Sequence, residues 1–366
     1  MFDALIVTAL QDEFDAALSA LRNAGAQLDL DNAESSSPYQ SYFLFASRGD
    51  PLRIALARPT RMGAIATSTI ASSLVERLRP RCIAMCGVCA GNPSDVALGD
   101  VIVAELSYFY DEGKRKKEGF EGDHRQIPLE DSWIRKAQEL RPDGLPTFGE
   151  ASESEANAWL LEQLYLGLDP KRHPARIRYL PEKALGLAFR KLEKAGLVQR
   201  RGTIFVLTDK GSATVEKSRA YDLASPKKLP YRIHVGPMAS GNVVVKDGLT
   251  WEMLKSLGVR TVLGLEMEAA AIAQIAFRQG VKHWIVAKGV MDYADPRKDD
   301  RYKAFAALSS AEVLLRFLSE ALSSERDVIS QEPQNSRTGD KSSTSVNVIG
   351  DVTGSHNNIN QTVRRD

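Results

Sequence analysis

Residues 261–292 read TVLGLEMEAAAIAQIAFRQGVKHWIVAKGVMD and combine an apolar helix with a buried strand. Glu266 and Glu268 stand where the helix begins, and the segment that follows is apolar on almost every side, which predicts burial. A short apolar strand over 283–287 then leads through Lys288 to Asp292. The stretch therefore places three carboxylates close to a helix start and a strand end.

Carboxylates in these places have two interpretations. They can line a pocket, because ligands of open α/β sheets bind outside the carboxyl ends of the strands. Alternatively, Glu266 and Glu268 only stabilise the helix N-terminus through its dipole. The pattern alone leaves both interpretations open.

The rest of the chain predicts a repeated alternation of strands and helices. Apolar strands are expected over 4–8, 81–86, 101–106 and 233–239, a hairpin over 42–57, and helices over 65–78 and 303–322. Gly87 is expected to break its strand, and 113–125 to form an exposed loop or lid. Strands that alternate with helices predict an α/β fold with three layers, in which helices cover both faces of a mostly parallel sheet.

Charge and composition divide the chain into four parts. The α/β pattern covers 1–150 and 230–322, with an insert at 151–229 and a low-complexity tail at 323–366. The net charge of the whole chain is only +1, but residues 171–228 carry 15 Lys and Arg against 5 Asp and Glu. The insert is therefore strongly basic, and the remainder has a net charge near −9.

The insert contains a helical pattern over 181–195, a stop at Gly196 and the string LVQRRGTIFVLTDKG. This order resembles the last helix and the wing of a winged-helix module. Phosphate contact through Arg200 and Arg201 is one interpretation; a solvated basic face and a protein-docking insert are the others. We favour a small molecule over nucleic acid as the partner. Only one candidate recognition helix is evident, and a basic patch alone does not establish nucleic-acid binding.

The cysteines and the N-terminus indicate the compartment. Cys82, Cys86 and Cys89 fall in one apolar segment, which argues against a disulfide framework and predicts buried side chains in a reducing cytosol. Cys86 and Cys89 have the spacing of a metal pair, but no second pair exists, so no metal is expected. No signal peptide and no apolar run of about 18 residues is present. We therefore predict a cytoplasmic protein without a membrane partner.

Within the tail, residues 345–363 read SVNVIGDVTGSHNNINQTV. Low charge, β propensity and a high Asn content are typical of segments that stack as cross-β. The alternative, which we favour for an isolated chain, is a disordered tail.

Five stretches resemble the nucleoside phosphorylase superfamily, in particular the branch with the methylthioadenosine/S-adenosylhomocysteine nucleosidases. They are IVTALQDEF, MCGVCAG, ALGDVIVAE, ASGNVVV with LEMEAAAIA, and AKGVMDYAD. Each is weakly specific alone, but they occur in family order over about 1–135 and 230–322. The basic insert and the tail lie outside the resemblance.

The resemblance implies a role for each matching residue. Asp292 would protonate the purine as its bond to the sugar breaks, and Glu13 would deprotonate the attacking water. Glu268 would hold the ribose hydroxyls, and carboxylate charge would stabilise an oxocarbenium-like sugar. The implied substrate-binding residues are Leu10, Met62, Gly87, Val88, Gly241, Asn242, Val244, Val245, Glu266, Met267, Glu268 and Lys288. Within this set, the two valines of ASGNVVV would pack the base.

Two departures from the family pattern bear on the nucleophile and the substrate. Phosphorylases of the superfamily carry Arg two residues before the glycine at position 87 and Ser just after it, whereas this chain has Met85 and Val88. Because a phosphate dianion needs such donors, water is the favoured nucleophile. Lys288 stands where nucleosidases carry Arg, so the far end of the sugar can bear a thioether or phosphates; Arg61 and Lys288 would then contact the phosphates.

The sequence therefore predicts a hydrolase that cleaves the N-glycosidic bond of an adenine-type nucleoside or nucleotide, without a cofactor and as a homo-oligomer. The alternatives are a purine nucleoside phosphorylase and a catalytically silent signalling or DNA-binding protein on the same fold. The basic insert and the tail also resemble parts of effector proteins in microbial immunity. In such an effector, the tail would pair with a like segment on a sensor protein.

Overall fold

The computed structural model describes residues 1–30, 37–45, 50–117, 119–220, 225–245, 247, 250–256, 261–296 and 300–331. Across these ranges, no helix is both long enough and apolar enough to cross a membrane. The predicted tail lies outside the described residues from 332 onwards. Residues 323–331 instead continue the last helix, which was predicted to end at 322.

The centre of the main sheet is parallel and buried. β1 (Ala4–Val7) pairs in parallel with β4 (Leu52–Ala57) on one side and β5 (Cys82–Gly91) on the other, and β5 pairs in parallel with β14 (His283–Asp292). These strands are nearly continuous apolar runs, as expected for strands that are covered on both faces.

The second half of the sheet curls back on the first. β6 (Val101–Phe109) pairs in parallel with β12 (Ile233–Ser240), and β12 with β13 (Gly264–Glu266). β13 also forms a short antiparallel pairing with β5, and β14 one with β6. Five strands therefore close into a ring, which the sequence did not predict because the closing contacts involve only two or three residues each.

Antiparallel strands complete the edges of the sheet. β3 (Tyr39–Leu44) pairs antiparallel with β4, which confirms the predicted hairpin, and β2 (Gln27–Leu28) pairs with β3. β9 (Ile127–Pro128) pairs with the outer part of β6.

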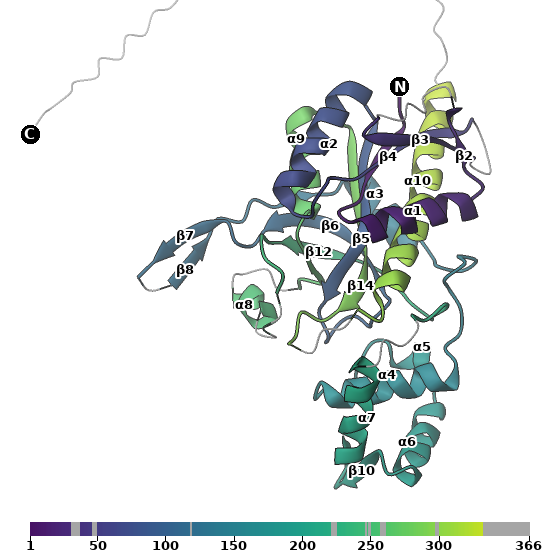
Figure 1. The fold of residues 1–366 in the computed structure, drawn as a ribbon, viewed down its shortest axis with the longest axis vertical. Coiled ribbons are helices and arrows are strands. Elements are labelled where there is room, and N and C mark those ends of the chain that lie inside the picture. The colour runs from purple at the N-terminus through teal and green to yellow at the C-terminus, as the bar shows by residue number, and fades with distance from the viewer. Residues whose placement is uncertain are drawn as a thin grey trace, which may run out of the picture.

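Helices cover both faces of the sheet (Figure 1). α1 (Gln11–Asn23) and α10 (Lys303–Gln331) pack together on one face. α2 (Ala64–Leu78) and α9 (Ala269–Gln279) pack together on the other. The predicted three-layer α/β fold is thus confirmed.

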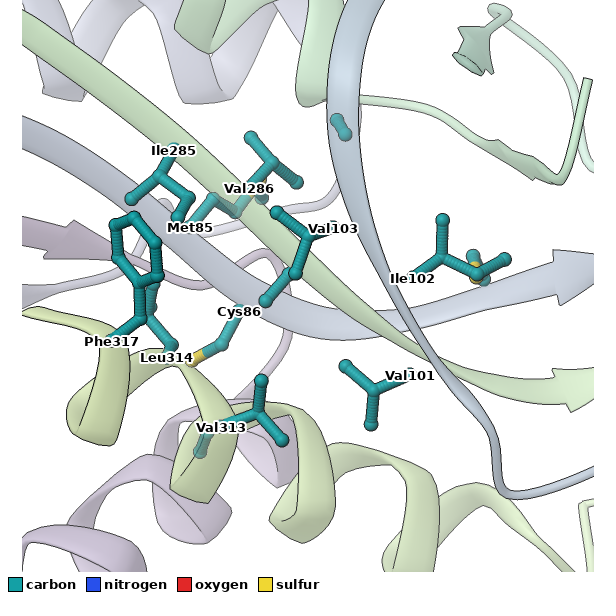
Figure 2. Close-up of a cluster of buried hydrophobic side chains, with 14 of the residues drawn as sticks. Met85, Cys86, Val101, Ile102, Val103, Ile285, Val286, Val313, Leu314 and Phe317 are labelled. Atoms are coloured by element: carbon teal, nitrogen blue, oxygen red, sulfur yellow. The ribbon is translucent and has the colours of Figure 1, made fainter. Parts of the chain in front are cut away.

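Part of the core lies between the sheet and α10 (Figure 2). Met85 and Cys86 of β5 pack there with Val286 of β14 and with Leu314 and Phe317 of α10. All three cysteines are buried and free, as the sequence predicted.

Both central strands are longer than predicted. We expected β5 to break at Gly87 and β14 to end before Lys288, but their pairing continues to Ala90 and Asp292. At Gly289, an added Cβ would lie 2.1 Å from the carbonyl oxygen of Ala306 in α10. This glycine therefore allows close packing of the helix within a strand and does not mark a turn.

The insert is built from short elements that lie apart from the sheet (Figure 1). They are α4 (Glu153–Tyr165), α5 (Arg176–Tyr179), α6 (Ala184–Lys194), β10 (Val198–Arg201), β11 (Ile204–Leu207) and α7 (Asp209–Ala220). The antiparallel β10–β11 pairing confirms the predicted hairpin. The two ends of the insert meet, because the N–H of Gly149 donates to the carbonyl of Leu229 (3.2 Å) and that of Leu229 to the carbonyl of Thr147 (3.2 Å).

A buried carboxylate anchors the insert to the core. Arg178 of α5 donates to both oxygens of Asp100, at 2.6 and 2.9 Å. His234 Nε2 lies 2.9 Å from the same carboxylate, and the N–H of Arg232 donates to it at 2.8 Å. Burial alone would raise the pKa of Asp100, but Arg178 and His234 outweigh it and hold the pKa well below its usual range.

The predicted loop or lid at 113–125 is instead a β-hairpin arm. β7 (Gly113–Lys116) and β8 (Gly119–Gly122) pair antiparallel and project from the body of the molecule (Figure 1). The remaining helices are α3 (Asp131–Glu139) and α8 (Thr250–Ser256).

Candidate active site

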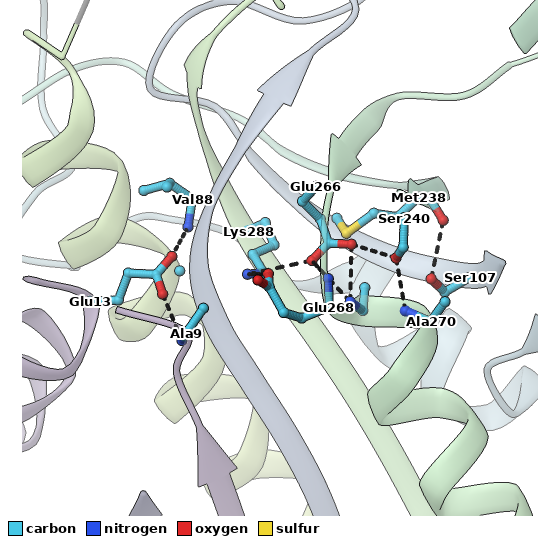
Figure 3. Close-up of polar contacts among 12 residues, drawn as sticks. Ala9, Glu13, Val88, Ser107, Met238, Ser240, Glu266, Glu268, Ala270 and Lys288 are labelled. Atoms are coloured by element: carbon cyan, nitrogen blue, oxygen red, sulfur yellow. Dashed lines mark hydrogen bonds and ion pairs between the residues drawn. The ribbon is translucent and has the colours of Figure 1, made fainter. Parts of the chain in front are cut away.

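Glu13 lies in the first turn of α1, after β1, and its buried side chain is held by three backbone N–H groups, two of which, from Ala9 and Val88, are drawn in Figure 3. Oε2 accepts from the N–H of Ala9 (2.8 Å) and of Leu10 (3.0 Å). Oε1 accepts from the N–H of Val88 in β5 (2.8 Å). These bonds fix the orientation of the carboxylate between two neighbouring strands.

Gly87 provides the space that Glu13 occupies. Its φ is +151°, and an added Cβ would lie 2.1 Å from Glu13 Oε1. Its N–H donates to Ser310 Oγ of α10 (3.1 Å). Glycine is therefore required here for a close approach by the carboxylate.

Glu266 ends β13 and caps the helix that follows. Its oxygens accept from the N–H of Glu268 (2.8 Å) and, with both atoms, from the N–H of Ala269 (3.0 and 2.9 Å). Ser240 Oγ donates to Glu266 Oε1 (2.5 Å) and accepts from the N–H of Ala270 (2.9 Å) (Figure 3). The helix-start interpretation of Glu266 is therefore correct, although the residue also lines the cavity described below.

Glu268 is the N-cap residue of α9 and pairs with a buried lysine. Its Oε1 accepts from the N–H of Gly63 (2.9 Å), and its Oε2 lies 3.7 Å from Lys288 Nζ. Burial raises the pKa of Glu268 to about 7; Lys288 opposes this shift, and the charges of Glu266 and Glu13 add to it.

Lys288 is fully buried, and its ammonium also lies 3.6 Å from Glu266 Oε2. Burial alone would lower the pKa of Lys288, but Glu13, Glu268 and Glu266 outweigh it and hold the pKa above its usual value. One buried cation therefore faces a group of three carboxylates.

Asp292 is the last residue of β14 and is 6% exposed. Its Oδ1 accepts from the N–H of Ala294 (2.8 Å), which closes a tight turn after the strand. The next residue, Tyr293, accepts from the indole N–H of Trp251 through its carbonyl oxygen (2.9 Å). The backbone on the C-terminal side of Asp292 is thus fixed.

The three carboxylates predicted to act in catalysis or sugar binding line a single cavity of about 230 Å³. The structure brings ten of the predicted site residues to this cavity: Leu10, Glu13, Met62, Val88, Val244, Val245, Glu266, Met267, Glu268 and Asp292. They come from segments that are up to 282 positions apart in the chain and meet at the carboxyl ends of β1, β5 and β14.

Four predicted site residues do not line this cavity. Gly87 lies behind Glu13, and Gly241 packs against the ring of Tyr110. Asn242 donates through its backbone and side chain to Asp111, at 2.9 and 2.8 Å. Lys288, the candidate contact for phosphates if the substrate carries them, is buried with its ammonium 3.6 Å from Glu266 and 3.7 Å from Glu268.

Several residues of the cavity wall were not predicted from the sequence. They are Ala9, Cys89, Ala90, Val243, Leu265, Met291, Ala294, Asp300 and Lys303. Lys303 begins α10, and its ammonium donates to Asp12 (2.7 Å), the neighbour of Glu13. In the sequence, only its position eleven residues after Asp292 indicated that Lys303 could reach the cavity. The loop between the two residues carries charges of both signs, so its composition does not single out Lys303.

A larger groove of about 1380 Å³ adjoins the cavity and shares Met62 and Met267 with it. Arg58 and Arg61 line this groove, together with the exposed Ile65. Arg61, which was predicted as a cation on the phosphate side, therefore lies beside the cavity and not in it.

Comparison with known proteins agrees with this fold. Residues 3–323 match the family model described as the phosphorylase superfamily. The chain therefore belongs to the phosphorylase superfamily.

Curated relatives match the chain over part of their own length. An uncharacterised protein of Sinorhizobium fredii is 25% identical over 259 residues, which are 70% of this chain and 46% of the relative. The ATP nucleosidase Cap17 of Escherichia coli is 22% identical over 256 residues, which are 70% of this chain and 39% of the relative. The chain thus spans less than half the length of these relatives.

Solved structures show the same fold. The methylthioadenosine/S-adenosylhomocysteine nucleosidase of Neisseria meningitidis, in complex with methylthio-immucillin-A, matches with a TM-score of 0.50 and 14% identity, over 87% of this chain and 98% of that one. The corresponding nucleosidase of Streptococcus pneumoniae, in complex with 8-aminoadenine, matches with a TM-score of 0.51 and 16% identity, over 87% and 99%.

Proposed function

We propose that this protein is a hydrolase that cleaves the N-glycosidic bond of an adenine-type nucleoside or nucleotide. The observation that carries the proposal is the presence of Glu13, Glu268 and Asp292 in one cavity. Three buried carboxylates in one place oppose folding unless each is well paired, so a catalytic requirement accounts for their presence.

Asp292 is the proposed general acid. It projects into the cavity from the end of a fully buried strand, next to the apolar Met291. Protonation of the purine by Asp292 would make the base a better leaving group as the bond to the sugar breaks. The carboxylates of Glu13 and Glu268 would stabilise the positive charge that develops on the sugar.

Glu13 is the proposed general base. A carboxylate can accept about four hydrogen bonds, and the three backbone N–H groups of Ala9, Leu10 and Val88 already occupy three of these sites. A water molecule in the cavity can occupy the remaining site and be deprotonated there. Glu268, one of whose oxygens is bound by the N–H of Gly63, would hold the ribose hydroxyls through the other.

Water is the proposed nucleophile because the cavity offers few donors for a phosphate dianion. Met85 is buried in the core, and the N–H of Val88 is already bound to Glu13. Of the described residues that line the cavity, Lys303 is the only cation, and its ammonium is paired with Asp12. If Asp12 released Lys303 to an incoming phosphate, the reaction would be phosphorolysis, which is the second candidate.

Adenine as the base is supported by the relatives, among which are an ATP nucleosidase and nucleosidases solved with adenine-type ligands. The groove beside the cavity, with Arg58 and Arg61, offers space and charge for a nucleotide's phosphates. A nucleoside would leave this groove empty.

A role as an immune effector, activated by a sensor protein through the tail, is a further part of the proposal that rests on the sequence alone. Deletion of residues 342–366 tests it, because activation by a partner that persists without them would exclude the tail from the mechanism.

The test of the proposed function is chromatography of the products after incubation with methylthioadenosine, S-adenosylhomocysteine, adenosine, ATP and NAD, each with and without phosphate. We expect adenine and a free sugar product from one substrate class without phosphate. A sugar 1-phosphate that forms only when phosphate is present would establish phosphorolysis instead. No release from any substrate, by the purified protein or in a lysate of its source, would contradict the assignment as an enzyme.

A further inference from the structure

The insert carries a basic face that the proposed hydrolysis does not use. Residues 183–210 contain seven Lys and Arg against two Asp and Glu. In α6 the apolar side chains Leu185, Phe189 and Leu192 are buried. At 3.6 residues per turn, Lys183, Leu187, Arg190 and Lys194 share the opposite side of the helix. All four are exposed.

Most of these cations form no ion pair with any residue that the structure describes. Among the described residues, none forms an ion pair with Lys183, Arg190 or Lys194. Lys191, which lies off this stripe, is paired with Glu153. The stripe on α6 is therefore positive charge that no contact within the described chain balances.

The β10–β11 hairpin extends the basic face beyond the end of α6. Arg200 and Arg201 are exposed on β10, and the Nε of Arg200 donates to the carbonyl of Gly202 (2.8 Å), which holds its side chain along the turn. Ile204, at the start of β11, is exposed as well. A basic helix followed directly by a basic hairpin is the order of a winged-helix module.

This face lies away from the active site. In Figure 1, α6 and β10 occupy the end of the insert that is farthest from the main sheet. Of the insert's described residues (151–220 and 225–229), none lines the cavity that holds Glu13 and Asp292. A macromolecule on α6 would therefore leave the cavity open.

We propose that this face of the insert binds double-stranded DNA, with α6 in the major groove and the β10–β11 hairpin on the adjacent backbone. The major groove of B-DNA, about 12 Å wide, admits one α-helix, and lysines and arginines along that helix neutralise phosphates. The single apolar residue of the stripe, Leu187, is positioned for contact with a thymine methyl group.

The shape and composition of the face favour DNA over other anionic partners. The deep, narrow major groove of A-form RNA does not admit a helix. An interface with a protein would have an apolar or aromatic centre, whereas the stripe on α6 offers only Leu187 between cations.

Fluorescence anisotropy of the full chain with a labelled DNA duplex tests this proposal. The variant Lys183→Glu, Arg190→Glu, Lys194→Glu changes only exposed side chains. Its matched control is Arg125→Glu, Arg172→Glu, Arg278→Glu, which makes the same charge change at exposed positions off the face. Circular dichroism verifies that both variants are folded.

We expect wild type to bind with an affinity that falls as salt rises, with the logarithm of the association constant decreasing by about 0.9 per unit of log salt concentration for each neutralised phosphate. The α6 variant should bind at least about tenfold more weakly and with a flatter slope, as expected when phosphate contacts are lost. The control should bind like wild type.

Absence of duplex binding at low salt would overturn the proposal, as would equal losses in the two variants. An A-form RNA duplex or polyglutamate that binds as tightly as DNA would overturn it in favour of an RNA or an acidic protein partner. Adenine release is measured in parallel and should be the same in all three proteins, so a failure of the proposed hydrolysis is distinguishable from a failure of DNA binding.

Discussion

Buried carboxylates need partners, and in this site most of the partners are backbone N–H groups. Glu13 and Glu266 each accept from at least two of them. Lys288 is the one buried cation of the group, and its ammonium lies more than 3.5 Å from the carboxylates of both Glu266 and Glu268. The site therefore holds more negative than positive charge. Burial, and after it the charges of Glu266 and Glu13, make Glu268 retain a proton more readily than an exposed glutamate.

The first prediction concerns the ionisation of Glu268, whose pKa is raised to about 7. If ionised Glu268 binds the ribose hydroxyls, kcat/KM of wild type should rise as the pH increases through about 7. Glu268→Gln should be slower and should lack this limb of the pH profile. If kcat/KM of the variant still rises through about pH 7, the rise belongs to another ionisable group and not to Glu268.

The same pKa has a consequence for stability. The pKa of Glu268 in the folded protein lies above the unfolded value of about 4.3. Its contribution to the free energy of unfolding is therefore fully present below pH 4.3 and is lost as the pH rises through about 7. Urea denaturation should therefore show that Glu268→Gln gains in stability relative to wild type between pH 4.5 and pH 8.

The second prediction concerns Gly87. An alanine at this φ costs about 1–3 kcal/mol, and its Cβ would also displace the carboxylate of Glu13. Gly87→Ala should therefore lower adenine release by about 100-fold or more, the range of a general base. The matched control is Gly25→Ala, which also has a positive φ (+73°) but open space around it; it should lose stability and keep its activity.

The residue types of the site could be predicted from the sequence, but not all of their positions. Glu13, Glu268 and Asp292 were accessible because they adjoin recognisable stretches and line the cavity. The role of Lys288 was not, because a lysine at the end of a strand pattern does not reveal whether its ammonium faces solvent or buried carboxylates. Lys303 depended on the path of the loop after Asp292, which composition does not determine.

Among the elements, α5 of the insert contacts the core through a buried ion pair. Arg178 binds Asp100 with two hydrogen bonds, and Tyr179 next to it stacks on Trp159 of α4 (ring centroids 5.2 Å apart). The N–H of Leu98, near Asp100, donates to the hydroxyl of Tyr293 (3.2 Å). Because Tyr293 follows Asp292, the docking of the insert and the end of β14 share one contact network.

The third prediction tests this docking. Arg178→Ala leaves Asp100 buried without its main partner, and the loss of one member of a buried pair costs about 3–5 kcal/mol. Chemical denaturation should show this loss, with a smaller decrease in adenine release through Tyr293. The control Arg172→Ala removes a guanidinium that is largely exposed and should have almost no effect.

The lowered pKa of Asp100 also predicts that the stability of the protein depends on pH in acid. Its pKa in the folded protein lies far below the unfolded value of about 3.9. Its contribution to the free energy of unfolding is therefore present above pH 3.9 and is lost as the pH falls towards the folded pKa. The stability difference between wild type and Asp100→Asn should therefore be constant above about pH 5 and should shrink in stronger acid. A difference that does not change with pH would contradict the depressed pKa.

At the scale of elements, strands with continuous apolar runs and helices with clear periodicity were predictable, because both signals are local. The extension of β5 past Gly87 was not, since a glycine in a strand pattern also fits a turn. The β7–β8 arm was mistaken for a loop because its alternation is obscured by charged residues on both sides of the hairpin.

For the molecule as a whole, the structure separates the cavity from the basic face of the insert. The homo-oligomer stays a prediction, and the exposed apolar side chains around the groove indicate where an interface would form. Ile65 and Val243 are 83% and 64% exposed beside the cavity, and Phe277 on α9 is 78% exposed.

The fourth prediction follows from these side chains. Ile65→Asp places a charge in the apolar patch and should reduce the mass measured by light scattering from that of an oligomer to that of one chain. Ile177→Asp, which changes a side chain that is 67% exposed on the insert, is the control and should leave the mass unchanged. A single-chain mass for wild type would contradict the predicted oligomer.

The most direct test of the central claim, hydrolysis at this cavity, is the rate of adenine release in phosphate-free buffer by four proteins. They are wild type, Asp292→Asn, Glu13→Gln and the control Asp15→Asn, which changes an exposed carboxylate on the same helix as Glu13. We predict that wild type and the control release adenine at equal rates and that the other two variants are slower by about 100-fold or more, as for the loss of a general acid or base. Release by Asp292→Asn at the wild-type rate would contradict the account.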